Sequence, residues 1–188
     1  MKKTGPTDYE KKYQALLWSL KEEFPGFRIV RKSDDRWQRI IDAVLIGLTL
    51  GHMRGYLTHY QTTLGQRVYV TDSWAELPAV ERWATMRHEA VHLRQFRKFT
   101  FLGMILLYLL VPLPTGLAYF RMRLEREAYE ETLRALYEAH GEGAVRNRAL
   151  REHMIAHFTS ASYGWMWPFP AALGRWYDGF VDRLAAGP

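Results

Sequence analysis

Two histidines, His88 and His92, stand four residues apart, and a glutamate, Glu89, directly follows the first. On a helix, residues four apart project from the same face, so both imidazoles can reach a single cation. Glu89 is then placed to contact a water bound to that cation rather than the cation itself. The spacing therefore predicts a metal site that activates water. The alternative is two surface histidines on an ordinary amphipathic helix.

The surrounding sequence predicts the helix that this chemistry requires. Pro78 suits a first helical turn, and the helix is expected to run at least to Lys98. Two β-rich runs, 56–63 and 66–70, precede it and favour a hairpin. Residues at helical spacing supply an apolar face that would hold the helix against a core: Val80, Trp83, Ala84, Val91 and Phe96.

A third ligand can be sought on the helix expected over about residues 121–140. Glu127 falls on a charged stripe that indicates a solvated face, with Arg123, Arg126, Glu130, Arg134 and Glu138. Glu125 lies about 200° away around the helix, on the side of Ala128, Tyr129, Thr132 and Leu136. An inward carboxylate needs a partner, because burying an unpaired one is costly. A zinc ion or a basic side chain would each satisfy Glu125.

A second histidine pair, His153 and His157, has the same spacing within a helix expected over 143–160. No glutamate stands between the two, so this pair would bind a metal without an obvious base. The alternative is one packed and one exposed histidine.

The run MRHEAVHLRQ, with Glu125 standing 33 residues after His92, resembles the gluzincin metallopeptidases over about residues 56–140. In that group, two histidines of an H-E-x-x-H motif and a glutamate of a later helix hold zinc. The chain is similar to the minigluzincins and to bacterial H-E-x-x-H-x-x-Q peptidase-like proteins, whose pattern Gln95 fits. The resemblance implies Zn²⁺ bound by His88, His92 and Glu125, with Glu89 as general base.

Further expectations follow from this resemblance. It implies that a downstream histidine or tyrosine stabilises the oxyanion, for which His157 and Tyr163 are candidates. Membrane gluzincins of the CAAX-processing type usually carry Asp four residues after the ligand Glu, where this chain has Tyr129. The expected activity is zinc-dependent hydrolysis of a peptide or protein substrate. The alternative is a catalytically silent zincin-fold module that binds metal or a partner.

An uncharged stretch of 22 residues, 99–120, separates the two parts of the expected site. Its length would permit a membrane crossing, but a crossing would place His88 and His92 opposite Glu125. Pro112 and Pro114 favour a helical hairpin instead. This hairpin would either dip into one leaflet, as a peripheral membrane contact, or pack within the domain. It must bend to bring Glu125 to the histidines, and Gly103 or Gly116 could allow the bend.

The positioning elements together predict an α+β fold, a mostly helical zincin-like domain over 1–188 with a small antiparallel sheet ahead of the active-site helix. The other expected elements are a helix that begins at Thr7 and is stopped by Pro25, a strand over 27–31, a helix capped by Asp34 or Asp35 that reaches about Leu48, and a short last helix around Trp176. The strand at 67–70, or its partner, would pair with an extended substrate.

Composition restricts the function classes. The net charge is +6 and the pI is near 9.6, but the basic residues are scattered and match no known nucleic-acid motif, so no nucleic-acid partner is expected. The chain has no cysteine, which excludes disulfides, thiolate ligands and a cysteine nucleophile. Its first residues lack the apolar run of a secretory signal, so a cytoplasmic location is expected.

Overall fold

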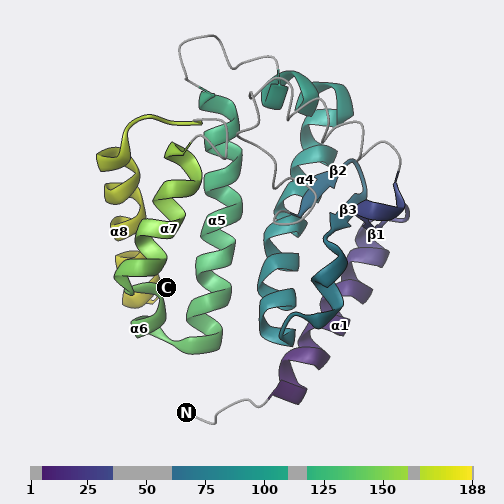
Figure 1. Cartoon of the computed structure of the whole chain (residues 1–188), viewed down its shortest axis with the longest axis horizontal. Coiled ribbons are helices and arrows are strands. Elements are labelled where there is room, and N and C mark those ends of the chain that lie inside the picture. The colour runs from purple at the N-terminus through teal and green to yellow at the C-terminus, as the bar shows by residue number, and fades with distance from the viewer. Residues whose placement is uncertain (1–5, 36–60, 110–117, 161–165, 188) are drawn as a thin grey trace. The chain divides into compact units, whose positions relative to one another are not determined.

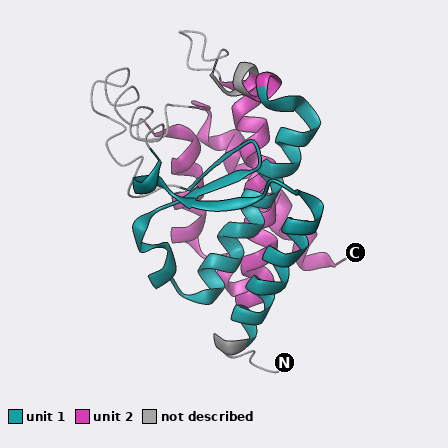
Figure 2. Cartoon of the chain, turned by 90° about the vertical axis from the view of Figure 1, so that its right-hand side faces the viewer, with its two compact units in different colours: residues 1–101 teal, residues 102–188 magenta. Residues whose placement is uncertain are grey.

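The computed structural model describes residues 6–35, 61–109, 118–160 and 166–187 (Figure 1). It divides into two compact units, residues 1–101 and residues 102–188 (Figure 2). The class is α+β, mostly helical with a small sheet, as the sequence predicts. The helix expected after Asp35, the start of the hairpin, the Pro112–Pro114 turn and Tyr163 lie outside the described residues.

In unit 1, helix α1 (Pro6–Glu23) runs alongside α4 (Ala79–Leu109) and is joined to it near both ends (Figure 1). Arg82 donates to Glu10 across 2.6 Å. At the other end of α1, Glu23 accepts bonds from Arg94 and Arg97, at 2.9 and 2.8 Å. The bond from Arg94 is the main reason that the pKa of Glu23 lies below its usual value.

The sheet consists of β1 (Arg28–Arg31), β2 (Thr62–Leu64) and β3 (Arg67–Val70), in the order β1-β3-β2. The hairpin β2–β3 is antiparallel and turns at Gly65, whose φ of 60° suits glycine. The expectation of a purely antiparallel sheet is wrong, because β1 pairs with β3 in parallel. A parallel pair requires a long connection, and the chain between β1 and β2 supplies it.

Helix α4 follows the short 3-10 helix η2 (Asp72–Glu76) and carries the histidine pair. It continues past Lys98, where the uncharged stretch begins, to Leu109. Its course is broken at Thr100, with φ 62° and ψ 167°. Of the two glycines expected to allow a bend, Gly103 lies within α4 and Gly116 lies outside the described residues, while the break in α4 is at Thr100. Such a conformation costs a β-branched residue about 1–3 kcal/mol.

Unit 2 contains α5 (Tyr119–His140), α6 (Glu142–Val145), α7 (Arg148–Thr159) and α8 (Pro170–Ala186). The single helix expected over 143–160 is interrupted at Asn147, whose side chain caps α7 by accepting from the backbone of Ala149 and Leu150.

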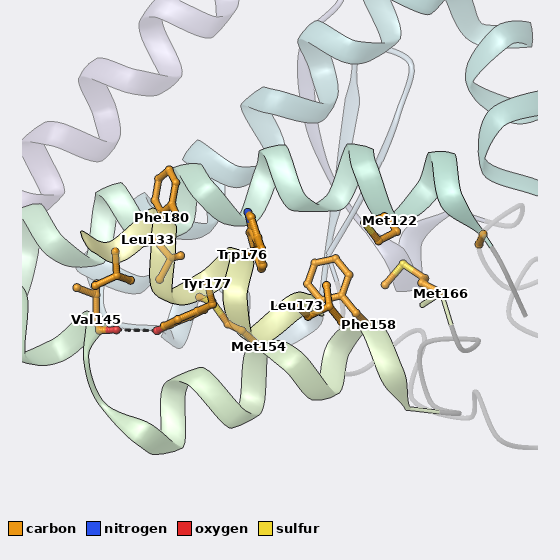
Figure 3. Close-up of a cluster of buried hydrophobic side chains, with 12 residues drawn as sticks. Met122, Leu133, Val145, Met154, Phe158, Met166, Leu173, Trp176, Tyr177 and Phe180 are labelled. Atoms are coloured by element: carbon orange, nitrogen blue, oxygen red, sulfur yellow. Dashed lines mark hydrogen bonds between the residues drawn. The ribbon is translucent and has the colours of Figure 1, made fainter. Parts of the chain in front are cut away.

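The core of unit 2 lies between α5, α7 and α8 (Figure 3). It is built around Phe158, Leu173 and Tyr177. The Tyr177 hydroxyl donates to the Val145 carbonyl at 2.7 Å and so satisfies a buried polar group. Within the described ranges, no helix combines the length and the apolar character that a membrane crossing needs.

Candidate metal centre

The His88 and His92 imidazoles face each other on α4, one helical turn apart. Their Nε2 atoms are 3.2 Å apart, and the rings meet edge to face with centroids 5.0 Å apart. His92 is buried and His88 is half-buried. The helix therefore directs the same ring nitrogen of both residues toward one point, as their spacing predicts.

Gln95 determines which nitrogen of His92 is available. Its Oε1 lies 2.9 Å from His92 Nδ1. A carbonyl oxygen only accepts hydrogen bonds, so Nδ1 carries the proton and Nε2 presents its lone pair. Gln95 is itself buried, which keeps this bond away from competing water. Hydrogen-bond partners of this kind orient the histidines that bind metals in proteins.

The distance between the two Nε2 atoms can be compared with the requirement of a zinc ion. Zn–N bonds of about 2.0–2.1 Å at a tetrahedral angle place two nitrogens about 3.3–3.4 Å apart. The separation here is 3.2 Å. The two histidines therefore fit as ligands of a single tetrahedral ion.

Glu89 lies beside the pair and is only 4% exposed. The hydroxyl of Thr63, on strand β2, donates to Glu89 Oε2 at 2.7 Å. The hairpin thus holds the carboxylate of the residue expected to act as the base. Sequence reasoning missed Thr63. The alternation of side chains along a strand shows which residues share a face, but not which of them contacts the helix.

Glu125 belongs to α5, in unit 2, and is half-buried, whereas Glu127 is exposed. This difference in exposure agrees with the prediction that the two side chains project from opposite sides of the helix. The charged stripe is less solvated than expected. The Arg126 guanidinium lies over the Trp176 ring at 5.0 Å, and Glu130 accepts from Trp176 Nε1 at 2.9 Å. Helix α8 therefore covers part of that face.

His157 lies near Glu125 within unit 2. The pKa of His157 is lowered to about 4, mainly by burial and also by the charge of His153, while Glu125 opposes both. Its ring stacks on Tyr129, with centroids 5.5 Å apart, and meets His153 edge to face. Among the residues that the structure describes, no third ligand joins His153 and His157 into a metal-binding group. His157 is therefore neutral at neutral pH.

Arg121 precedes Glu125 by one turn on α5. Burial lowers the pKa of its guanidinium to about 10, and Tyr129 opposes this shift. The guanidinium consequently stays charged at neutral pH and adds positive potential on the side of the helix that carries Glu125. Sequence reasoning missed Arg121, which directly follows the uncharged stretch 99–120.

Comparison of the chain with families of known proteins, with curated proteins and with solved structures finds no match. The similarity to gluzincins thus depends on the motif residues alone, and it stays a prediction.

Proposed function

We propose that this chain is a zinc-dependent hydrolase of peptide bonds. The observation that supports it most is the 3.2 Å separation of His88 Nε2 and His92 Nε2, directly beside the buried Glu89. The resemblance to gluzincins implies Glu125 as the third ligand beside the two histidines. We assign all three as the zinc ligands.

Each residue then has a distinct task. A zinc ion in this position would lower the pKa of a bound water toward about 7 and polarise the substrate carbonyl. Glu89 accepts the proton of the attacking water and passes it to the leaving amine. Thr63 holds one oxygen of Glu89, which keeps the carboxylate oriented for this transfer. Gln95 keeps Nε2 of His92 unprotonated.

The sheet suggests where an extended substrate would bind. The sequence left two strands open for this pairing, and β3 is the less suitable one, because it lies between β1 and β2 and both of its edges are used. Strand β2 has one strand neighbour within the described part of the chain. A peptide adding to the other edge of β2 would run past Thr63, whose hydroxyl contacts Glu89. We therefore assign the β2 edge as the substrate site.

Two measurements on protein purified without chelators test the proposal. Metal analysis should find close to one zinc per chain, and a library of quenched fluorescent peptides should be cleaved. Cleavage should stop with a chelator and return with added zinc. A chain that binds no zinc would exclude the proposal, and one that binds zinc without cleaving any peptide would be a metal-binding module.

A further inference from the structure

Aromatic side chains form a connected cluster on unit 2, where α5 begins and where the chain approaches α8. We call it the aromatic patch, and it consists of Tyr119, Phe120, Trp167 and Phe169. The Tyr119 ring contacts Phe120 and Trp167, with centroids 5.6 and 5.9 Å away. Trp167 in turn meets Phe169 at 5.2 Å. The four rings are thus one continuous apolar surface drawn from two distant segments.

Most of this surface is open to solvent. Tyr119, Phe120 and Phe169 are 44, 45 and 51% exposed. Single exposed apolar residues are common on proteins, but a contiguous aromatic group indicates a binding surface.

The backbone beneath the patch is fixed. The Ala118 amide donates to the Met166 carbonyl at 3.1 Å, and the Trp167 amide donates to the Phe158 carbonyl at 2.9 Å. Ala118, Met166 and Phe158 are themselves buried in the core of unit 2. The rings are therefore presented on an ordered scaffold, so binding through them needs little additional ordering.

The two stretches of sequence that contain the patch residues have basic but no acidic side chains. Within unit 2, residues 102–124 and 153–177 contain no aspartate or glutamate, but three arginines, Arg121, Arg123 and Arg175. The exposed Arg123 stands one turn after Tyr119 on the same helix.

We propose that the aromatic patch docks this protein on the surface of an anionic lipid membrane. Tryptophan, tyrosine and phenylalanine are favoured at the level of the lipid headgroups. Arginine beside them is attracted to acidic lipids. A second copy of the chain fits less well, because it would bring two acid-free, basic surfaces together. The aromatic patch contains none of the residues assigned to catalysis or zinc binding. The variant Glu89→Gln should therefore bind membranes as the wild type does.

Sedimentation with vesicles tests this proposal on the full chain. The wild type should bind vesicles of phosphatidylcholine and phosphatidylserine, bind pure phosphatidylcholine far less, and be released by salt. The double variant Phe120→Ser, Phe169→Ser should lose at least about tenfold in partitioning. Arg123→Gln should lose about fivefold. The matched control is Trp18→Ser, which removes a 64% exposed ring on α1 and should bind normally.

A second readout places the patch at the bilayer. Brominated lipids should quench part of the wild-type tryptophan fluorescence. Trp167→Phe keeps an aromatic ring in the patch, so it should still bind vesicles but lose quenching.

Several results would overturn the proposal. One is a wild type that ignores phosphatidylserine vesicles, and another is a double variant that binds them fully while remaining folded by circular dichroism. A wild-type dimer that the double variant dissociates, without vesicle binding, would assign the patch to self-association instead.

Discussion

Glu89 is the side chain whose replacement separates metal binding from catalysis. Glu89→Gln keeps the volume and an oxygen that can accept from Thr63, but it removes the basic carboxylate. Zinc content should stay near that of the wild type, because Glu89 is not assigned as a ligand. Peptide hydrolysis should fall at least about a hundredfold, a usual contribution of a general base. Metal analysis and a fluorescent peptide assay measure the two effects, and unchanged hydrolysis would remove Glu89 from the mechanism.

Gln95 acts on zinc only through His92. Gln95→Leu removes the carbonyl that accepts from His92 Nδ1, so the preferred tautomer is lost. Zinc affinity should fall about 10–100-fold, as for other outer partners of metal ligands. Gln95→Glu retains an acceptor and should bind zinc nearly as the wild type does. Competition with a chromophoric chelator gives both affinities, and equal loss in the two variants would show that packing rather than the hydrogen bond matters.

Glu125 and Glu127 provide a matched pair for the third ligand. Glu125→Ala should release or greatly weaken zinc, and it should lower the melting temperature as far as metal binding supports the fold. Glu127 is exposed, so Glu127→Ala should retain zinc and cost at most about 0.5 kcal/mol. Zinc content and melting curves with and without chelator decide between them. Loss of zinc in Glu127→Ala alone would mean that the helix presents the opposite face to the metal.

At the scale of elements, the break in α4 at Thr100 has a measurable cost. Its φ of 62° with ψ of 167° is a conformation that glycine adopts without strain. Thr100→Gly should therefore raise stability, although glycine also gains entropy in the unfolded chain. At Lys98, which has ordinary helical geometry, the same change should cost about 1 kcal/mol. Urea denaturation compares the two variants, and destabilisation of the same size in both would contradict the strain.

The elements also show which parts of the fold were predictable. Helices α1, α5 and α8 and the β2–β3 hairpin were visible as local periodicity, caps and a glycine turn. The parallel β1–β3 pairing was not, because it joins residues far apart in sequence. The break at Thr100 was not predicted, because glycine and proline are the usual signals of a break and neither stands there.

The candidate site also has features that the sequence predicts and features that it does not. The common direction of His88 and His92, and the different exposure of Glu125 and Glu127, follow from the rotation of about 100° per residue along a helix. The contact of Thr63 with Glu89 could not be predicted, because it depends on how a strand packs on a helix. The sequence predicts one domain over residues 1–188. The structure divides into two compact units, and the single domain stays a prediction.

For the whole molecule, His157 predicts a loss of stability in acid. The folded chain binds this proton only below about pH 4, whereas an ordinary histidine in the unfolded chain binds it below about pH 6.5. The unfolded state therefore takes up more protons in this range, and stability falls as pH drops from about 6.5 to about 4, by up to about 3 kcal/mol.

The variant His157→Phe keeps a ring against Tyr129 but cannot be protonated. Its stability should decline less than that of the wild type between pH 7 and pH 4, as urea denaturation at a series of pH values would show. The exposed His140 is the control, since His140→Gln should leave the pH dependence as it is. Parallel curves for the wild type and His157→Phe would mean that His157 does not titrate in this range.

The parallel pairing of β1 with β3 has a consequence for the order in which the chain folds. Arg28 is opposite Arg67, so this contact closes a loop of almost forty residues. Closing such a loop is slow compared with forming the neighbouring helices of unit 2, whose contacts are local. The β2–β3 hairpin, which carries Thr63, gains its third strand only when β1 pairs with β3. We therefore expect the histidine pair to be in place early in folding, and Glu89 to be fixed in orientation only at a late step.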